Sequence, residues 1–186
     1  MRIISGFLKG KKINFLKNAN TRPLKDAVKE NIFNILKHSN LINVKIEQSN
    51  ILDLYSGFGS FGLECISRGS KKVTFVEQDF KAANILKENL IKLSILNKAL
   101  VANHKIENVL ENFKKNRFSI FFLDPPFIKT DFLQTLRTIK EKKLFKKNHI
   151  VIIHREKKTQ DNLENIINVL FIKQYGRSKI IFGFFN

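Results

Sequence analysis

The sequence lacks several features that would tie it to a particular class of protein. It has no tryptophan, three prolines and a single cysteine in 186 residues. That residue, Cys65, cannot form an internal disulfide, which is typical of a reducing compartment, so we expect a cytoplasmic protein. One cysteine and four scattered histidines give no zinc-ligand spacing, and we expect no metal site.

Long apolar runs are also missing. No stretch approaches the roughly 18 consecutive apolar residues of a membrane helix. The start of the chain lacks the apolar core of a signal peptide. No internal repeat or Pro-rich linker is visible. We therefore expect no membrane partner, and a monomer built as one domain with a modest appendage.

Acidic residues are scarce. The chain has 34 Lys and Arg against 16 Asp and Glu, which gives a net charge of +18. Such an excess favours a polyanionic partner such as a nucleic acid. Most of the basic residues are lysines, and the chain is also rich in Asn, Ile and Phe. An A/T-biased genome would produce the same mixture, so the charge supports nucleic-acid binding without establishing it.

The most informative motif is Asp124-Pro125-Pro126-Phe127, which follows the apolar run 118–123. An apolar run that stops at prolines indicates a buried parallel strand, because proline offers no N–H to a neighbouring strand. The motif then falls at the carboxyl edge of a sheet, where open α/β proteins bind ligands. There Asp124 and the Pro125 carbonyl oxygen could accept hydrogen bonds from an amino group, while a planar base stacks on Phe127. A tight turn that only ends the strand is the alternative.

A glycine-rich loop lies earlier in the chain. Gly57, Gly59 and Gly62 follow a short apolar strand and precede a helical pattern. Glycine permits close approach of a ligand to the backbone, and the helix N-terminus offers unpaired N–H groups. The spacing matches the dinucleotide fingerprint, which alone is weak evidence. The next strand ends at Glu77, whose carboxylate could accept hydrogen bonds from ribose hydroxyls or be an ordinary solvated acid.

The order of elements predicts an α/β fold. From residue 51 onward strands and helices alternate, which favours a parallel sheet. Near the end, two strand-like segments flank the turn 175–177, which predicts a closing antiparallel hairpin. The first part of the chain predicts a hairpin over 2–16, a turn at 21–24 and a helix over 25–38. The predicted strands are 51–55, 73–77, 99–103, 119–123, 149–154, 166–173 and 178–185, and the later helices are 60–69, 80–95, 106–115 and 131–143.

Together, the glycine loop, the acid after the second strand and Asp-Pro-Pro-Phe resemble the class I methyltransferases that use S-adenosylmethionine. Further segments narrow the resemblance to the RsmD-type family, which methylates the exocyclic N2 amine of a guanine in small-subunit ribosomal RNA. These segments are Met1-Arg-Ile-Ile-Ser-Gly, Thr21-Arg-Pro-Leu-Lys-Asp, Phe33-Asn-Ile-Leu, Leu63-Glu-Cys-Ile-Ser-Arg-Gly and Lys173-Gln-Tyr-Gly-Arg-Ser.

The resemblance implies a Rossmann-like class I methyltransferase fold with a seven-stranded, mostly parallel sheet and a C-terminal antiparallel hairpin. It also implies a small N-terminal extension of hairpin and helix that helps to hold RNA. We therefore expect an RNA-binding extension over residues 1–45 and an S-adenosylmethionine-dependent methyltransferase domain over residues 46–186. The implied partner is small-subunit ribosomal RNA or its assembly particle.

The resemblance also implies roles for single residues. It assigns catalysis to Asp124, Pro125, Pro126 and Phe127, and cofactor contacts to Asp53, Tyr55, Gly57, Gly59 and Glu77. Relatives commonly have an acid near the adenine after the third strand, where this chain has Asn103, which could still accept a hydrogen bond from the adenine amine. For RNA we expect a basic surface beside the active cleft, formed by Arg2, Lys9, Lys11, Lys12 and Arg22.

Other functions fit part of the pattern. A nicotinamide-dependent dehydrogenase would explain the glycines, but it gives no purpose to a prolyl strand end with a stacking aromatic. A noncatalytic RNA-binding or ribosome-assembly protein could keep the fold. An amino-methyltransferase acting on DNA, on another RNA or on glutamine is a third alternative, since Asp-Pro-Pro can serve any planar amine.

Overall fold

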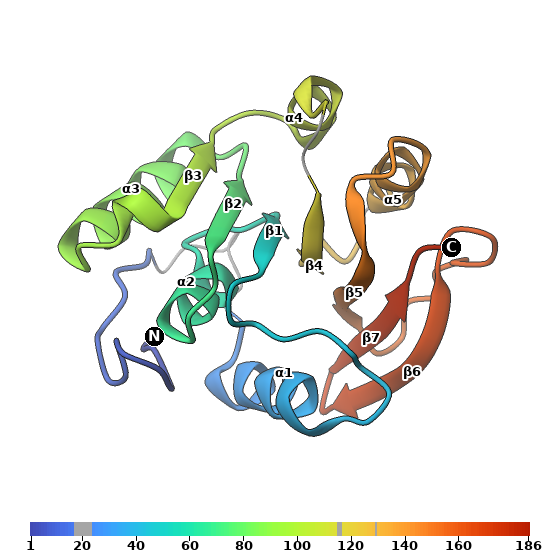
Figure 1. The fold of residues 1–186 in the computed structure, drawn as a ribbon, viewed down its shortest axis with the longest axis horizontal. Coiled ribbons are helices and arrows are strands. Elements are labelled where there is room, and N and C mark those ends of the chain that lie inside the picture. The colour runs from blue at the N-terminus through green and yellow to red at the C-terminus, as the bar shows by residue number, and fades with distance from the viewer. Residues whose placement is uncertain (17–23, 115–116, 129) are drawn as a thin grey trace.

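The structure is a computed structural model that describes residues 1–16, 24–114, 117–128 and 130–186. In this part of the chain, the centre is a seven-stranded sheet of order β3-β2-β1-β4-β5-β7-β6 (Figure 1). The strands β1 to β5 are parallel, and β7 pairs antiparallel with both β5 and β6. The strands are β1 (Asn50–Leu54), β2 (Lys72–Val76), β3 (Ala99–Ala102), β4 (Phe118–Leu123), β5 (Phe145–Glu156), β6 (Asn168–Tyr175) and β7 (Ser178–Phe184).

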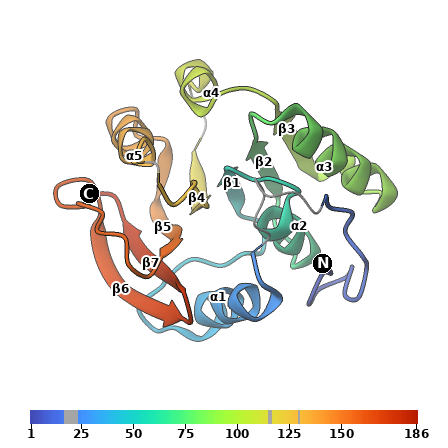
Figure 2. The same ribbon diagram turned by 180° about the vertical axis from the view of Figure 1, so that it is seen from behind.

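Helices cover both faces of the sheet. The helices α1, α2 and α3 lie over one face, and α4 and α5 lie over the other (Figures 1 and 2). Each face has its own cluster of buried apolar side chains, which is why β4 is buried along its whole length. The helices are α1 (Asp26–His38), α2 (Ser60–Ser67), α3 (Phe80–Lys92), α4 (Ile106–Asn112) and α5 (Phe132–Glu141), with a 3₁₀ helix η1 (Leu96–Lys98) before β3.

The sheet order brings particular strand ends together. The strand β1 lies between β2 and β4, and Leu54 pairs with Val76 on one side and Leu123 on the other. The next strand, β5, continues this register, with Ile153 beside Leu123. Because these strands are parallel, the residues that follow them all meet at one edge of the sheet. Chains that leave a sheet in opposite directions at such a point create a crevice for a ligand.

The fold class predicted from the sequence is confirmed, including the C-terminal antiparallel hairpin. Some boundaries differ. The strand β5 begins at Phe145 rather than 149, since it pairs early with Phe118. The strand β6 begins at Asn168 rather than 166, because Ile166 and Ile167 turn into the apolar cluster beneath α4 and α5.

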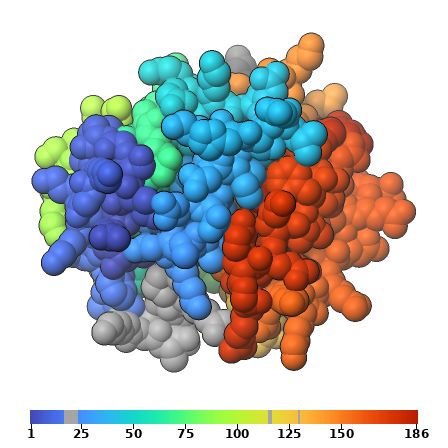
Figure 3. All heavy atoms as spheres, turned by 90° about the horizontal axis from the view of Figure 1, so that it is seen from below, coloured from blue at the N-terminus to red at the C-terminus, as the bar shows by residue number. Residues whose placement is uncertain are grey.

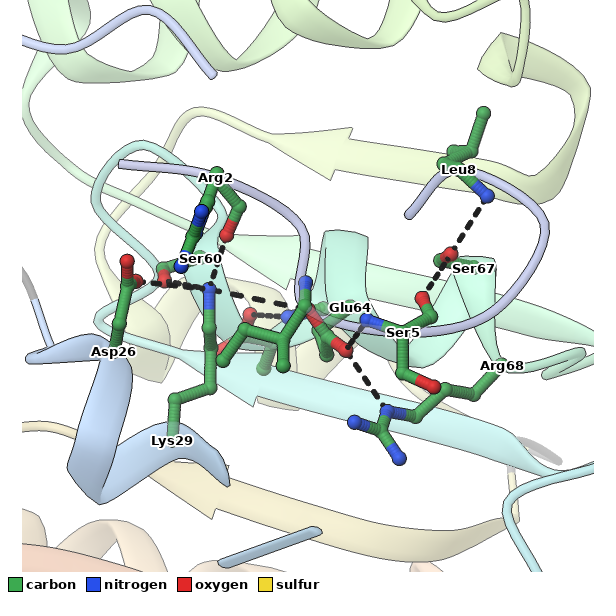
Figure 4. A network of polar contacts seen from close by, with 12 residues as sticks. Arg2, Ser5, Leu8, Asp26, Lys29, Ser60, Glu64, Ser67 and Arg68 are labelled. Atoms are coloured by element: carbon green, nitrogen blue, oxygen red, sulfur yellow. Dashed lines mark hydrogen bonds and ion pairs between the residues drawn. The ribbon is translucent and has the colours of Figure 1, made fainter. Parts of the chain in front are cut away.

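The N-terminal segment, residues 1–16, doubles back as predicted, and its two arms pair antiparallel, with the N–H groups of Ile3 and Ile13 donating to the carbonyl oxygens of Lys11 and Met1 at 3.0 and 3.1 Å. This pairing is short: it amounts to one antiparallel bridge between Arg2 and Lys12, and the described part of the segment contains no regular strand. Beyond this bridge, side chains of α2 accept hydrogen bonds from the backbone of the segment and hold it against that helix. Glu64 accepts hydrogen bonds from the N–H groups of Ile4 and Ser5 at 2.7 and 2.9 Å, and the Ser67 hydroxyl accepts one from Leu8 at 3.0 Å (Figure 4).

A buried ionic network holds this segment against α1 and α2 (Figure 4). The side chains of Lys29 and Glu64 are both fully buried, with Nζ 3.9 Å from Oε2. Lys29 also donates to the Arg2 carbonyl oxygen at 2.9 Å and lies 3.6 Å from Asp26. Burial lowers the pKa of Lys29, although Glu64 and Asp26 oppose this effect. The network therefore joins the start of the chain to two helices.

Residues 1–45 and the rest of the chain share one apolar cluster. Ile3, Leu8 and Ile32 pack with side chains of α2 and of the central strands. From below, the N-terminal segment and α1 form a continuous blue surface beside the red C-terminal strands (Figure 3). The division into two functional parts at residue 45 remains a prediction. The predicted turn at 21–24 falls mainly outside the described residues.

No helix of the described residues is long and apolar enough to cross a membrane.

Candidate active site

A cavity of about 660 Å³ opens at the carboxyl edge of the parallel strands. It lies where the loops after β1, β2 and β4 converge, as expected from the strand order. Most of the predicted cofactor and catalytic residues line it, although their sequence positions are far apart. These are Asp53, Tyr55, Gly57, Glu77, Asp124, Pro125, Pro126 and Phe127.

The cavity is acidic although the protein is strongly basic. Its described lining contains six carboxylates and neither lysine nor arginine. Against a net charge of +18, this concentration of negative charge marks a site that favours a cation. The carboxylates belong to Asp53, Glu77, Asp79, Glu107, Asp124 and Asp131.

Asp53 forms the floor of the cavity at the end of β1. Its Oδ2 accepts a hydrogen bond from the Gly62 N–H at 2.9 Å, while Oδ1 is buried with no partner among the described residues. Burial raises the pKa of Asp53 well above its usual range, and the Gly62 hydrogen bond only partly opposes this. A buried carboxylate oxygen without a partner is costly unless a ligand supplies one.

The three glycines of the loop after β1 have different structural roles. Gly57 lines the cavity and donates its N–H to Glu77 at 2.8 Å. Gly59 is the residue before α2 and has a φ of 82°, which disfavours other residues. At Gly62 a Cβ would lie 2.2 Å from the Phe75 ring and 2.9 Å from Asp53 Oδ2. Gly59 and Gly62 therefore shape the loop and the Asp53 contact.

Glu77 organises the second side of the cavity. Its Oε2 accepts from Gly57 and its Oε1 accepts from the Asp79 N–H, both at 2.8 Å. Burial raises the pKa of Glu77, and these backbone hydrogen bonds partly oppose the rise. A carboxylate has about four lone-pair sites, so it retains capacity for further donors such as hydroxyl groups.

Asn103 does not line the cavity. Its amide nitrogen donates to the carbonyl oxygens of Glu77 and Gln78 at 2.8 and 3.2 Å. These hydrogen bonds hold the backbone that follows β2. A direct contact of Asn103 with adenine remains a prediction. Glu107 and Ile106 of α4 line the cavity on this side instead.

Two consecutive residues of β5 hold the Asp-Pro-Pro-Phe turn. Arg155 is 1% exposed and donates from its guanidinium to the Pro126 and Phe127 carbonyl oxygens at 3.1 and 3.0 Å. His154 lies beside the turn, with its Nδ1 2.9 Å from Asp124 Oδ1. Its ring also meets the Phe127 ring edge to face, with centroids 5.5 Å apart. The turn is therefore fixed at both its carbonyls and its carboxylate.

Sequence reasoning missed both residues. The signal was available, because His154 and Arg155 follow the apolar run 150–153 in the same way that Asp124 follows 118–123. A polar pair at the end of a buried parallel strand lies at the ligand edge of the sheet. Their partners Ser178 and Asp161 come from the C-terminal region, and no local pattern indicates them.

The predicted RNA-binding residues are spread along the N-terminal segment. Arg2, Lys9, Lys11 and Lys12 are all exposed. Met1 lines the cavity, which brings the start of the segment to the site, whereas Lys9 lies in the turn that bonds Ser67 at the far end of α2. A common RNA surface formed by these residues remains a prediction, and Arg22 lies outside the described residues.

The strand order, the glycine loop after β1 and the acidic cavity beside Asp-Pro-Pro-Phe define the fold of class I S-adenosylmethionine-dependent methyltransferases. Within this class, the chain belongs to the RsmD family, whose model, described as Conserved hypothetical protein 95, matches residues 1–184.

Similar proteins support this membership. The chain is 35% identical over 159 residues to Ribosomal RNA small subunit methyltransferase D of Haemophilus influenzae, an alignment that covers 84% of this chain and 79% of that protein. It is 35% identical over 156 residues to the protein of the same name from Buchnera aphidicola, covering 84% and 76%. The solved structure described as "Putative methyltransferase yhhF from Escherichia coli" has a TM-score of 0.81 and 25% identity, and the match covers 100% of this chain and 98% of that chain.

Proposed function

We propose that this protein transfers a methyl group from S-adenosylmethionine to the exocyclic N2 amine of a guanine in small-subunit ribosomal RNA. The observation that carries the proposal is the acidic cavity that ends at Asp124 and Phe127. The carboxylates of this cavity favour a positively charged cofactor. At its end, Asp124 can accept a hydrogen bond from an amine and the Phe127 ring can stack on the planar base that carries it.

The cavity fits the cofactor that the fold implies. S-adenosylmethionine carries a sulfonium and an ammonium group, and six carboxylates line the cavity. The unpartnered Asp53 Oδ1 supports binding of the ammonium group, and Glu77 has remaining capacity for ribose hydroxyls. A nicotinamide cofactor would bring an anionic pyrophosphate among these acids, with no lysine or arginine in the described lining to balance it. The charge of the site therefore favours S-adenosylmethionine.

Asp124 and Phe127 suit an exocyclic amine as the methyl acceptor. When bound, the cofactor supplies the methyl group, whose bond to sulfur breaks as its bond to nitrogen forms. The lone pair of such an amine delocalises into the ring, so acceptors that hold its N–H groups favour a pyramidal, nucleophilic nitrogen. Asp124 and the Pro125 carbonyl oxygen are the proposed acceptors, and such positioning contributes several kcal/mol. The nitrogen then loses a proton, which Asp124 receives directly or through water.

The choice of RNA rests on the relatives and on charge. The relatives from Haemophilus influenzae and Buchnera aphidicola are named for methylation of small-subunit ribosomal RNA. A net charge of +18 suits a polyanionic substrate. The target base must leave its stack to reach the cavity, and Phe127 is the proposed platform for it. A cytoplasmic monomer acting on the RNA or its assembly particle completes the proposal.

Mass mapping of methylated nucleosides in small-subunit ribosomal RNA tests the proposal. RNA or particles from cells that lack the protein should lack one N2-methylguanine, and the purified protein with S-adenosylmethionine should restore it. Restoration of methylation on another base, or only on DNA or glutamine, would replace the guanine assignment. Binding of NAD without binding of S-adenosylmethionine would overturn the reaction class.

A further inference from the structure

We infer that His154 is a positioning residue for methyl transfer, which holds the Asp124 carboxylate in the orientation that receives the acceptor amine. This inference rests on the proposed function. The histidine is on β5 and the aspartate follows β4, so the contact joins two strands that are neighbours in the sheet.

The sheet register creates the contact. Leu123 pairs with Ile153, and the residues that follow them are Asp124 and His154. The imidazole Nδ1 then lies 2.9 Å from Asp124 Oδ1. The histidine is 8% exposed and lines the cavity, whereas the aspartate side chain is 22% exposed. The carboxylate thus faces the cavity from a buried support.

The hydrogen-bond partners assign the tautomer of the ring. A carboxylate only accepts hydrogen bonds, so Nδ1 carries a proton and donates it to Asp124. The Nε2 atom lies 2.9 Å from the Ser178 hydroxyl of β7, which can donate to it. Ser178 is therefore compatible with the tautomer that serves Asp124, and the carboxylate is the partner that requires it. A carboxylate held through Oδ1 keeps Oδ2 for the amine.

The same ring also supports the stacking platform. The His154 and Phe127 rings meet at 87°, an edge-to-face arrangement that restrains the Phe127 ring. One side chain thus contacts both the acceptor carboxylate and the aromatic ring of the turn. Its loss would leave Asp124 free to rotate, and misplacement of a reacting group by about 1 Å can cost on the order of 100-fold in rate.

Three variants separate positioning from general stability. His154→Leu removes the donor, while His154→Asn retains an N–H close to the position of Nδ1. His149 provides the matched control, because it is a 9% exposed histidine five positions earlier on the same strand and outside the cavity lining, with Nε2 accepting from the Phe185 N–H at 2.9 Å. His149→Asn should alter melting behaviour without a specific loss of methyl transfer.

Single-turnover methylation of small-subunit ribosomal RNA is the principal measurement, with product nucleosides identified by mass. We expect His154→Leu to slow transfer by about 10- to 100-fold while S-adenosylmethionine and RNA affinities stay within about threefold. The asparagine variant should recover most of the rate. In an Asp124→Ala background, His154→Leu should cause only a small further loss, from the Phe127 ring, because the histidine acts mainly through the aspartate.

A folded His154→Leu protein with normal turnover would overturn the inference, as would equal losses in the leucine and asparagine variants or additive losses with Asp124→Ala. If His154→Leu does not fold, the inference is tested by His154→Asn, which should keep most of the rate, and by Ser178→Ala, which removes the contact at Nε2 and should slow transfer. Nitrogen-15 NMR of the imidazole should show the Nδ1–H tautomer in the wild type and a change in Asp124→Ala. If the product carries the methyl group on a different nitrogen, the guanine N2 proposal fails but the inference about His154 does not. The His154 variants can then be compared with the wild type on that other acceptor.

Discussion

The buried guanidinium of Arg155 and the buried carboxylate of Asp161 form an ion pair that fixes the turn of the active site. Nη2 lies 2.9 Å from Oδ1, and the two side chains are 1% and 2% exposed. From this pair, Arg155 reaches the carbonyl oxygens of Pro126 and Phe127. The geometry of the Asp-Pro-Pro-Phe turn thus depends on a residue that follows it by more than thirty positions.

We expect Asp161→Asn to destabilise the protein by about 3 kcal/mol, because it leaves a buried guanidinium without its counter-charge. Denaturant unfolding measures this loss. Glu156→Gln is the control, since its partner Arg177 is 79% exposed in its side chain and that pair should contribute under about 1 kcal/mol. Equal losses in both variants would argue against a structural role for the buried pair.

Asp124→Ala should reduce methyl transfer by roughly 10²–10⁴-fold, because it removes both the acceptor for the amine and the proton acceptor. S-adenosylmethionine affinity should change little, since Asp53 and Glu77, and not Asp124, are the proposed cofactor contacts. Single-turnover assays beside melting curves separate this from unfolding. A folded variant with near-normal turnover would end the mechanism proposed here.

Cofactor binding should release protons in the pH range where the buried carboxylates titrate. Burial raises the pKa of Asp53 and of Glu77 in the free protein. A bound ammonium and sulfonium favour the charged carboxylates and so lower these pKa values. Affinity should therefore fall as the pH falls through the raised pKa values, where protons compete with the cation. Calorimetry in buffers of different ionisation enthalpy checks this, and a heat that is independent of the buffer would contradict it.

Glu64→Gln should loosen the N-terminal segment. The variant removes the counter-charge of buried Lys29 and weakens the acceptor shared by the N–H groups of Ile4 and Ser5. We expect a loss of about 3 kcal/mol and faster hydrogen exchange at these two amides. Glu30→Gln, at an exposed acid of α1, is the matched control. Unchanged exchange at Ile4 and Ser5 would show that the network does not hold the segment.

Charge reversal tests the proposed RNA surface without removing the N-terminal segment. Lys11→Glu with Lys12→Glu should weaken RNA binding. The slope of log affinity against log salt concentration should fall by the equivalent of about two phosphate contacts. Lys146→Glu with Lys147→Glu makes the same change in charge at the exposed amino end of β5, away from the cavity. Filter binding over a range of salt compares them. Equal effects from both pairs would contradict the proposed RNA surface, because they would show only a general attraction between the positive protein and RNA.

Local patterns in the sequence were sufficient for the fold class and for one half of the site. The apolar run before Asp124 predicted a buried strand, and the prolines predicted where it ends. The glycines and Glu77 likewise mark strand ends. These predictions succeed because strand burial, proline and glycine act on the few residues beside them.

The N-terminal hairpin shows how far such local patterns reach. The sequence predicted a hairpin over 2–16, and the structure pairs its arms only at the bridge between Arg2 and Lys12, while Glu64 and Ser67 of α2 accept hydrogen bonds from the rest of the segment. Both acceptors lie about sixty positions further along the chain. A partner at that distance leaves no trace in the local sequence, so the local prediction does not show which helix the segment packs against.

The sequence by itself determined the strand ends, the glycine loop and the turn that carries Asp124. Only the tertiary structure decided which side chains meet there: His154 beside Asp124, Arg155 on the carbonyls of the turn, and six carboxylates around one cavity. The physical reason is that these contacts depend on strand register and on the order of strands in the sheet. Both are set by packing between residues far apart in the chain, whereas an element and its end are set by the residues within it.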